Sequence, residues 1–358
     1  MSKENIMIAM SGGVDSSVAA YLMLQAGYDC TGATMKLCDN ALLGLDNNCS
    51  LDNAEDARSV AQRLGMQFHL FDNTAQFRKQ VVDRFVRCYE SGGTPNPCID
   101  CNRHIKFDVF LQNALALGFS HIATGHYAQI KQDPASGRYL LYKAADRAKD
   151  QSYFLACLSQ DQLAHTKLPL GELTKDQVRQ IAEEQGFINA RKRDSQDICF
   201  IPNGDYKAFL ERYTGKQYPA GDYLDFAGNI VGKHSGAVGY TIGQRKGLGI
   251  ALGEPVYVCE KDMEHNTVTV GKEDALFCTA LRAQDWNWIS VQGLAEPIRC
   301  KARVRYRHAE QPATVYPEEN GLARVEFDQP QRAITAGQAV VLYDGDMVIA
   351  SGTITEAI

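Results

Sequence analysis

The sequence lacks both a membrane-spanning run and a secretory leader. Hydrophobic residues make up 45% of its 358 residues and charged residues 22%, and no stretch reaches the roughly 18 consecutive apolar residues of a membrane helix. The first ten residues contain no apolar segment of signal-peptide length. We therefore predict a cytoplasmic protein that has no membrane partner.

An excess of positive charge and a disulfide framework are missing as well. The chain has 37 basic and 43 acidic residues and a formal net charge of −6, so a nucleic-acid partner would need a local basic patch. Its 11 cysteines are an odd number spread over the whole length, which is not the pattern of a secreted disulfide scaffold. In a reducing compartment such cysteines are core residues, metal ligands or reactive thiols.

The first 200 residues do contain a regular alternation of short apolar runs and helical patterns. This alternation predicts right-handed crossovers and an α/β fold with a doubly wound parallel sheet, with residues 1–201 as one domain. We expect strands at 6–10, 29–36, 66–71 and 121–124, and helices at 16–25, 52–64, 74–89, 103–117 and 175–185.

The later part of the sequence has a different pattern. Glycine becomes dense, and short alternating runs at 256–260 and 267–270 predict a small β-rich domain over 202–272. A C-terminal β-barrel over 273–358 is predicted from five further strand patterns. These patterns lie at 280–288, 299–308, 313–316, 323–327 and 339–343.

The most informative segment is the run IMIAMSGGVDSS at 6–17. An apolar strand leads into Ser11, two glycines, Asp15 and Ser16, and then directly into a helix. Glycines let the backbone approach an anion, which helix-start N–H groups and serine hydroxyls bind. Asp15 beside a polyphosphate requires a cation between them, which favours Mg²⁺. The alternative is a capped glycine turn without a ligand, and the Lys-Ser/Thr of a Walker A loop is absent.

Two cysteines stand in polar surroundings far apart in the chain. Cys101, in TPNPCIDCNRHIKF, is predicted close to the start of a helix over 102–117, where the helix dipole, Arg103 and Lys106 would lower its thiol pKa. Cys199 lies at the border of the first domain. Three alternatives stay open for these cysteines. They are inert core thiols, a zinc site weakly supported by a single C-x₂-C, and an iron–sulfur cluster held by Cys98, Cys101 and Cys199.

The loop SGGVDS resembles the PP-loop of the ATP pyrophosphatases, which cleave ATP between the α and β phosphates. Further along the chain an ordered series of motifs resembles the bacterial tRNA-specific 2-thiouridylases over essentially the full length. The motifs are AMSGGVDSS, GATMKL, TPNPCIDCNRHIKF, ATGHYA, KDQSYFL, RDSQDICFI, GYTIGQRKGLGI and KARVRYRH. The resemblance implies ATP-dependent 2-thiolation of the wobble uridine, with the anticodon arm of tRNA as substrate.

In that family the first cysteine is the nucleophile and the second carries a persulfide, which assigns these roles to Cys101 and Cys199. The persulfide sulfur would come from a cysteine desulfurase or a sulfur-relay protein. One departure is that many members have Asn-Pro-Asp where this chain has Asn96, Pro97 and Cys98. The extra thiol of Cys98 keeps the iron–sulfur alternative open and leaves the usual role of aspartate at the target base in question.

The loop and the resemblance together define the residues expected to bind ATP and tRNA. Met35 ends a strand at the edge where open α/β sheets bind ligands, so it packs either on adenine or in the core. The residues expected to bind ATP are Ala9, Met10, Ser11, Gly12, Gly13, Val14, Asp15, Ser16, Met35 and Gly125. The resemblance assigns to tRNA Asn96, Pro97, Cys98, His126, Lys149, Asp150, Gln151, Gln244, Arg245, Arg305, Tyr306 and Gln338.

The run RCKARVRYRH at 299–308 has a basic residue at every odd position. Strand period two would place these five cations on one face and Cys300, Ala302, Val304 and Tyr306 on the other. Such a face would neutralise RNA phosphates, and a solvated outer strand is the alternative. Two other functions compete with tRNA thiolation: another PP-loop ligase or amidotransferase, and a non-catalytic tRNA-binding or iron–sulfur protein.

Overall fold

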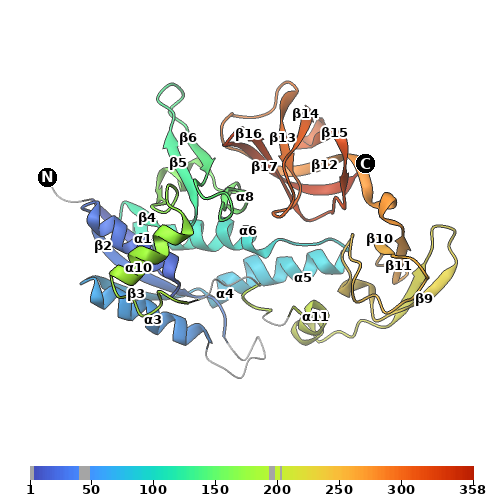
Figure 1. Ribbon diagram of the computed structural model, residues 1–358, viewed down its shortest axis with the longest axis horizontal. Helices are drawn as coiled ribbons and strands as arrows, with labels where there is room; N and C mark the ends of the chain where they lie inside the picture. Colours follow the sequence, from blue (N-terminus) through green and yellow to red (C-terminus); the bar gives the residue numbers. More distant parts are fainter. Residues whose placement is uncertain (1–3, 40–48, 193–197, 202–203) are drawn as a thin grey trace.

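The computed structural model describes residues 4–39, 49–192, 198–201 and 204–358 (Figure 1). Its N-terminal part is a five-stranded sheet in the order β3-β2-β1-β4-β7, and every neighbouring pair is parallel. This sheet confirms the predicted α/β fold. Its strands are β1 (Asn5–Ala9), β2 (Asp29–Lys36), β3 (Gln67–Asp72), β4 (His121–Ala123) and β7 (Thr166–Lys167).

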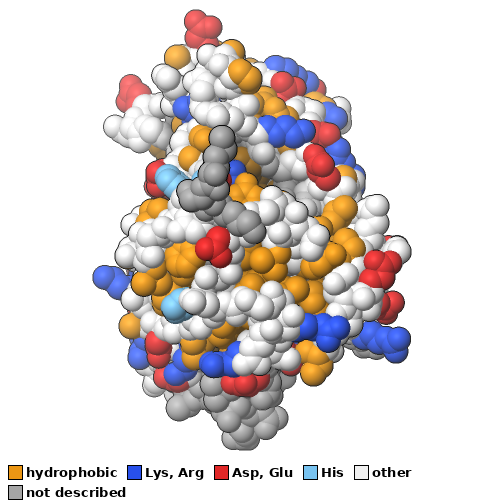
Figure 2. Space-filling view, turned by 90° about the vertical axis from the view of Figure 1, so that its left-hand side faces the viewer, with side chains coloured by type: hydrophobic (Ala, Val, Ile, Leu, Met, Phe, Trp, Pro, Cys, Tyr) orange, Lys and Arg blue, Asp and Glu red, His pale blue; other side chains and the backbone are white. Residues whose placement is uncertain are grey.

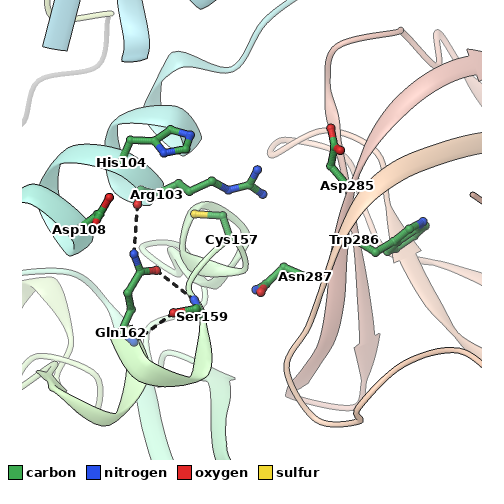
Figure 3. A pocket seen from close by; sticks show the side chains of 9 residues that line it. All are labelled: Arg103, His104, Asp108, Cys157, Ser159, Gln162, Asp285, Trp286 and Asn287. Atoms are coloured by element: carbon green, nitrogen blue, oxygen red, sulfur yellow. Dashed lines mark hydrogen bonds between the residues drawn. The ribbon is translucent and has the colours of Figure 1, made fainter. Parts of the chain in front are cut away.

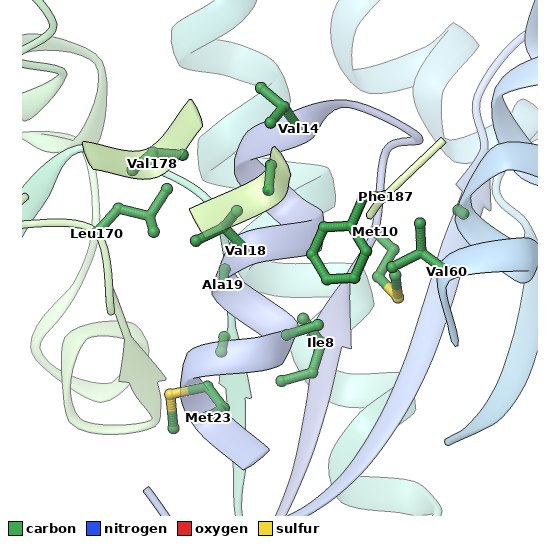
Figure 4. Close-up of a cluster of buried hydrophobic side chains, with 14 of the residues drawn as sticks. Ile8, Met10, Val14, Val18, Ala19, Met23, Val60, Leu170, Val178 and Phe187 are labelled. Atoms are coloured by element: carbon green, nitrogen blue, oxygen red, sulfur yellow. The ribbon is translucent and has the colours of Figure 1, made fainter. Parts of the chain in front are cut away.

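Helices cover both faces of the sheet because its central strand is apolar on both sides. Ile8 packs into a cluster with Val18 and Val60 (Figure 4), to which Ile6 also belongs. Met7 packs with Phe110 on the opposite face of the sheet. Each fully buried side chain of this size stabilises the fold by roughly 1.5–3 kcal/mol. The helices that contribute to the first cluster are α1 (Val14–Gln25), α3 (Cys49–Arg63) and α10 (Lys175–Glu184).

Two long helical segments on the other side contain π-helical turns. The first consists of α4 (Thr74–Phe77), η1 (Arg78–Val82) and α5 (Asp83–Glu90), and the second of α6 (Pro97–Cys101), η2 (Asn102–Val109) and α7 (Phe110–Ala116). The second segment begins six residues before the predicted start at 103. Its first residue is a proline, a residue favoured at the first helical position because it has no N–H to leave unpaired.

The C-terminal part is a closed six-stranded barrel, as predicted, because β12 pairs with both β15 and β17. The strands are β12 (Phe277–Trp288), β13 (Ile298–Arg303), β14 (Gln311–Pro317), β15 (Ala323–Arg332), β16 (Ala339–Asp344) and β17 (Met347–Ala357). β17 has no counterpart among the predicted strands. The short helices η4 (Glu273–Leu276) and η5 (Glu319–Gly321) lie before and within the barrel sequence.

A hairpin that the sequence patterns did not predict joins the two large parts. Its strands β5 (Ala128–Gln132) and β6 (Tyr139–Lys143) leave the N-terminal part, and Tyr142 pairs with Met347 of the barrel (Figure 1). Short helices α8 (Ser152–Leu155) and α9 (Gln160–Ala164) follow the hairpin. The hairpin therefore extends the barrel sheet toward the N-terminal parallel sheet.

A small four-stranded sheet, in the order β10-β11-β8-β9, lies between these parts in the sequence. Its strands are β8 (Gly221–Leu224), β9 (Ile230–His234), β10 (Tyr257–Asp262) and β11 (Thr267–Gly271), and α11 (Tyr206–Thr214) and η3 (Ala237–Gly239) accompany them. In the described part of the chain, no helix has the length and apolarity needed to span a bilayer.

The predicted basic strand is shorter than expected. β13 ends at Arg303, so Arg305 and Arg307 lie beyond it and the five cations do not form one strand face. The alternation holds over the strand itself, because Cys300 and Ala302 enter the barrel core.

The view of the β3 side of the molecule shows charged side chains of both signs scattered among apolar ones (Figure 2).

Candidate active site

The loop between β1 and α1 has the geometry of an anion-binding turn. The Ser11 N–H donates to Ser16 Oγ at 3.1 Å, and Ser16 Oγ donates to the Gly13 carbonyl at 3.0 Å. Gly13 precedes α1 and has no side chain to cap the helix, so first-turn N–H groups stay available to an anion. The loop thus presents backbone donors and hydroxyls at one sheet edge.

Two glycines at this loop are required by close backbone contacts. Gly12 has φ +73°, and a Cβ there would lie 2.2 Å from the carbonyl oxygen of Asn53. A Cβ on Gly125, just after β4, would lie 2.7 Å from the Asp15 carbonyl carbon and from the Ser16 nitrogen. The carboxyl ends of β1, β2 and β4 are adjacent in the parallel sheet, so the loop, Met35 and Gly125 meet at one edge.

The Asp15 carboxylate is held by two side chains that were not among the predicted site residues. Lys175 Nζ lies 2.7 Å from Asp15 Oδ1 and 2.9 Å from Oδ2, and the Tyr127 hydroxyl donates to Oδ1 at 2.8 Å. A cation therefore stands next to Asp15, as the sequence argument required, but it is an ammonium group of the chain. Both oxygens of this carboxylate thus have partners within the chain, and the role of Asp15 as a magnesium ligand stays a prediction.

A further contact to the loop was also missed. Asn189 Nδ2 donates to the Gly12 carbonyl at 3.1 Å and to Ser17 Oγ at 2.9 Å, and Lys192 Nζ lies 3.4 Å from the same carbonyl. Asn189 is buried, and no partner is found for its Oδ1 among the described residues. The loop is thus fixed by a segment more than 170 residues away, for which the local sequence carries no signal.

The predicted cysteines converge on one apolar cluster. Cys101 is 7% exposed and lies in a cluster with Ile105 and Phe200, against which Cys38 packs. Phe200 anchors the neighbouring Cys199, whose own side chain keeps an exposed surface. Residues 193–197 of the RDSQDICFI motif lie outside the described residues. All three cysteines named here are free thiols.

The expected lowering of the Cys101 thiol pKa is wrong. Burial raises its pKa to about 11, although the charge of Lys106 opposes this effect. The physical reason is that the helix begins at Pro97, so Cys101 lies at the end of α6 and not in its first turn. At pH 7 a thiol of pKa 11 is ionised in only about one molecule in ten thousand.

Lys106 is the cation that these thiols share. Cys98 and Cys199 keep exposed surface as residues, but the protein packed around their sulfurs removes water and raises the pKa of Cys98 and, more strongly, that of Cys199. Cys101 raises the pKa of Cys199 further, and Lys106 lowers both values. Burial also lowers the pKa of His126, and Lys106 lowers it further. The charge of Lys106 therefore acts on these thiols and on His126, which follows Gly125, and the lowered pKa leaves His126 neutral at physiological pH.

A metal centre is not preformed at these thiols. Among the described residues, no three histidine, cysteine, aspartate or glutamate side chains converge as metal ligands. Cys98, Cys101 and Cys199 therefore do not fit the predicted iron–sulfur cluster.

Several predicted tRNA contacts lie where the barrel meets the nucleotide-binding fold. Gln338 Nε2 donates to the carbonyls of Thr94 and Pro95 at 2.8 and 3.2 Å, next to the segment Asn96, Pro97 and Cys98. Tyr306 donates its hydroxyl hydrogen to the Asp150 carbonyl at 3.2 Å. These contacts join the predicted stretches in two pairs: Gln338 with the segment before Asn96, and Tyr306 with Asp150.

Other predicted tRNA residues have structural partners. The Asp150 carboxylate is buried and accepts hydrogen bonds from the Ala144 and Ser152 N–H groups at 2.9 and 3.2 Å. Arg305 is half-buried and donates to Thr335 Oγ1 and to the Ile242 carbonyl.

The remaining predicted residues divide between backbone contacts and the surface. Gln151 Oε1 accepts from the Tyr127 N–H at 2.9 Å, and Gln244 Oε1 accepts from the Thr241 N–H at 3.1 Å. Lys149 is half-buried, and Arg245 is exposed.

A cavity of about 490 Å³ opens between η2 and β12 (Figure 3). The residues that line it from β12 were not among the predicted site residues. Arg103 and His104 line it from η2, and Trp286 lines it from the barrel. Gln162 also lines the cavity, and its Nε2 donates to the Arg103 carbonyl at 3.2 Å. Arg103 therefore points toward the barrel, which is a second reason why it does not activate Cys101.

Comparison with known families gives matches over three consecutive segments. The family described as tRNA methyl transferase HUP domain matches residues 4–203. The tRNA methyl transferase PRC-barrel domain matches residues 207–272, and the aminomethyltransferase β-barrel domain matches residues 278–354.

The parallel sheet and the glycine loop make this chain a PP-loop protein of the ATP-pyrophosphatase class. It is 49% identical over 358 residues to the tRNA-specific 2-thiouridylase MnmA of Acetivibrio thermocellus, covering 99% of this chain and 100% of that protein. It is 47% identical to the enzyme of the same name from Symbiobacterium thermophilum, covering 99% and 93%. The chain belongs to the tRNA-specific 2-thiouridylase family.

Among solved structures, a 4-thiouridine synthetase–RNA complex with bound ATP is 17% identical, with a TM-score of 0.35. The match covers 56% of this chain and 46% of that chain. The assignment to the family does not depend on this similarity.

Proposed function

We propose that this protein catalyses the ATP-dependent 2-thiolation of the wobble uridine of tRNA, in the cytoplasm where ATP and tRNA meet. The observation that carries the proposal is the packing of Cys101 in one cluster with Phe200, the neighbour of Cys199, beside the shared cation Lys106. Its charge acts on Cys98, Cys101 and Cys199 and also on His126, which adjoins the ATP edge at Gly125. This supports a single site for the sulfur chemistry and the nucleotide chemistry.

The first chemical step makes the uracil C2 oxygen a leaving group. That oxygen attacks the α-phosphate of ATP, which forms an adenylated base and releases pyrophosphate. The loop from Ser11 to Ser16 holds the phosphates, and Gly12 and Gly125 allow the close backbone packing against Asn53 and Asp15 that shapes this loop. ATP enters as its magnesium complex, so the ion belongs to the substrate.

The second step needs a sulfur nucleophile, which a persulfide on Cys199 supplies. Cys101 attacks the Cys199 sulfur of the persulfide, the S–S bond breaks, and the released sulfide displaces AMP from C2. The two cysteines then form a disulfide, which a cellular thiol reduces by two electrons before the next cycle. Burial keeps Cys101 protonated at rest, so tRNA docking or rearrangement beside Lys106 has to favour its thiolate.

The exposed surface of Cys199 suits the loading of sulfur by another protein. Buried Cys101 would be inaccessible to such a donor, whereas Cys199 is exposed. The donor is a cysteine desulfurase or a sulfur-relay protein.

We also propose that the chain is divided into an ATP-binding domain at 1–201, a central domain at 202–272 and a tRNA-binding barrel at 273–358.

The proposal is tested by incubating the protein with unmodified tRNA, MgATP and a persulfide donor and analysing the tRNA nucleosides by mass spectrometry. We expect 2-thiouridine at the wobble position, and pyrophosphate released only when tRNA is present. Pyrophosphate release without tRNA would indicate a ligase of another substrate. A tRNA complex without turnover of ATP would indicate a binding protein.

The barrel cations give a separate expectation for tRNA binding. Arg307 is exposed, whereas the Arg303 guanidinium lies 5.3 Å from the Tyr306 ring centroid and 5.7 Å from that of Tyr153. Arg307→Ala should weaken tRNA binding and reduce the slope of log K against log salt by about one. Arg303→Ala should instead lower the melting temperature. Filter binding at several salt concentrations measures the slope, and an unchanged slope for Arg307→Ala would remove this residue from the tRNA interface.

A further inference from the structure

The ion pair between Asp15 and Lys175 joins the phosphate loop to a helix 160 residues away in sequence. The ammonium group contacts both carboxylate oxygens, at 2.7 and 2.9 Å, and the lysine side chain is only 6% exposed. The Asp15 side chain retains 29% exposure. The buried partner is therefore the lysine, while the carboxylate stays at the border of the ligand site.

The position of Lys175 is unfavourable for a lysine by local rules. It is the first residue of α10, where the partial positive charge of the helix N-terminus repels a cation. Thr174 and Gln177 form a complete capping box, so the helix start needs no lysine side chain. Burying an ammonium group is unfavourable as well, unless a charge compensates it. Asp15 supplies a compensating charge.

Asp15 alone would oppose the binding of ATP. It lies in the first turn of α1, where the phosphates are expected, and an uncompensated carboxylate there repels the polyphosphate. A hydrogen bond from Tyr127 at 2.8 Å stabilises the carboxylate but does not cancel its charge. The ammonium group of Lys175, which contacts both oxygens, does neutralise the charge of the Asp15 carboxylate.

We propose that Lys175 is a positioning residue of the ATP site, which neutralises Asp15 so that the polyphosphate can approach the loop. The inference rests on the proposed use of ATP, but it concerns binding and is independent of sulfur transfer. Lys175 acts through Asp15, and the ion pair also holds the start of α10 against the loop.

The test measures the dissociation constants of MgATP, AMP and adenosine by calorimetry on the full-length protein without tRNA. Lys175→Met should weaken MgATP binding by on the order of a hundredfold, AMP binding less, and adenosine binding hardly at all, since the effect grows with ligand charge. The double variant Asp15→Asn/Lys175→Met should regain at least tenfold for MgATP. Lys175→Arg should retain most of the affinity.

The matched control is Lys233→Met, which removes an exposed lysine paired with Asp222 in the central sheet. It should leave all three dissociation constants unchanged. Equal losses for MgATP and adenosine, or a double variant as weak as Lys175→Met, would overturn the proposal in favour of a purely structural ion pair. Melting temperatures show whether each variant is folded during the titration. Because tRNA is absent, failure here is distinct from failure of the thiolation assay.

Discussion

Cys101→Ala and Cys199→Ala are each expected to lower tRNA thiolation by about a thousandfold or more, while Cys98→Ala retains substantial activity. The persulfide route forms and breaks sulfur–sulfur bonds at Cys101 and Cys199 only, so no other group replaces either thiol. Both variants should still release pyrophosphate when tRNA is present, because adenylation precedes sulfur transfer. Mass spectrometry of 2-thiouridine and a pyrophosphate assay measure the two steps separately.

A buried cysteine of the barrel provides the control. Cys300 is 8% exposed, close to the 7% of Cys101, but it lies in the barrel core. Cys300→Ala should therefore retain thiolation and lose only stability. The opposite pattern, in which Cys98→Ala is as inactive as the other two and anaerobically purified protein contains iron, would establish a cluster mechanism in place of the persulfide route.

The nucleotide-binding fold was predictable because its signals are local. An apolar run, a glycine loop and a helical pattern follow one another within 25 residues, and β2 has the bounds expected from its sequence. The barrel was predictable from its spaced strands in the same way. The β5–β6 hairpin was missed because its stability depends on pairing with β17, which lies some 200 residues later.

The errors at the site arose where tertiary contacts decide the chemistry. The sequence predicts Cys101 close to the start of a helix at 102, whereas the helix already begins at Pro97, four residues before Cys101. Arg305 was assigned to a strand face by alternation, but its partners Thr335 and Ile242 belong to other segments. The sequence around Lys175 does not indicate a role at the phosphate loop, because only the folded chain brings this lysine to Asp15.

Among substitutions that add a single methyl group, Gly12→Ala is expected to weaken ATP binding most. An alanine there would adopt φ near +73° and place its Cβ 2.2 Å from the Asn53 carbonyl oxygen, which is backbone within helix α3. The loop has little freedom to move away, because Asn189 fixes the Gly12 carbonyl from the other side. We expect Gly12→Ala to weaken MgATP binding by about a hundredfold or more, measured by calorimetry, and to abolish pyrophosphate release.

Gly65→Ala is the control that distinguishes the Asn53 contact at Gly12 from the conformational penalty of any alanine with a positive φ. Its φ is +69°, but a Cβ there would have no heavy atom within 4 Å. Gly65→Ala therefore incurs only the conformational penalty of roughly 1–2 kcal/mol, which should lower the melting temperature and leave ATP affinity unchanged. If both variants bound MgATP as the unmodified protein does, the loop would not be the phosphate site. If both lost binding equally, the loss would reflect stability, and the close approach of Asn53 would not matter for the nucleotide.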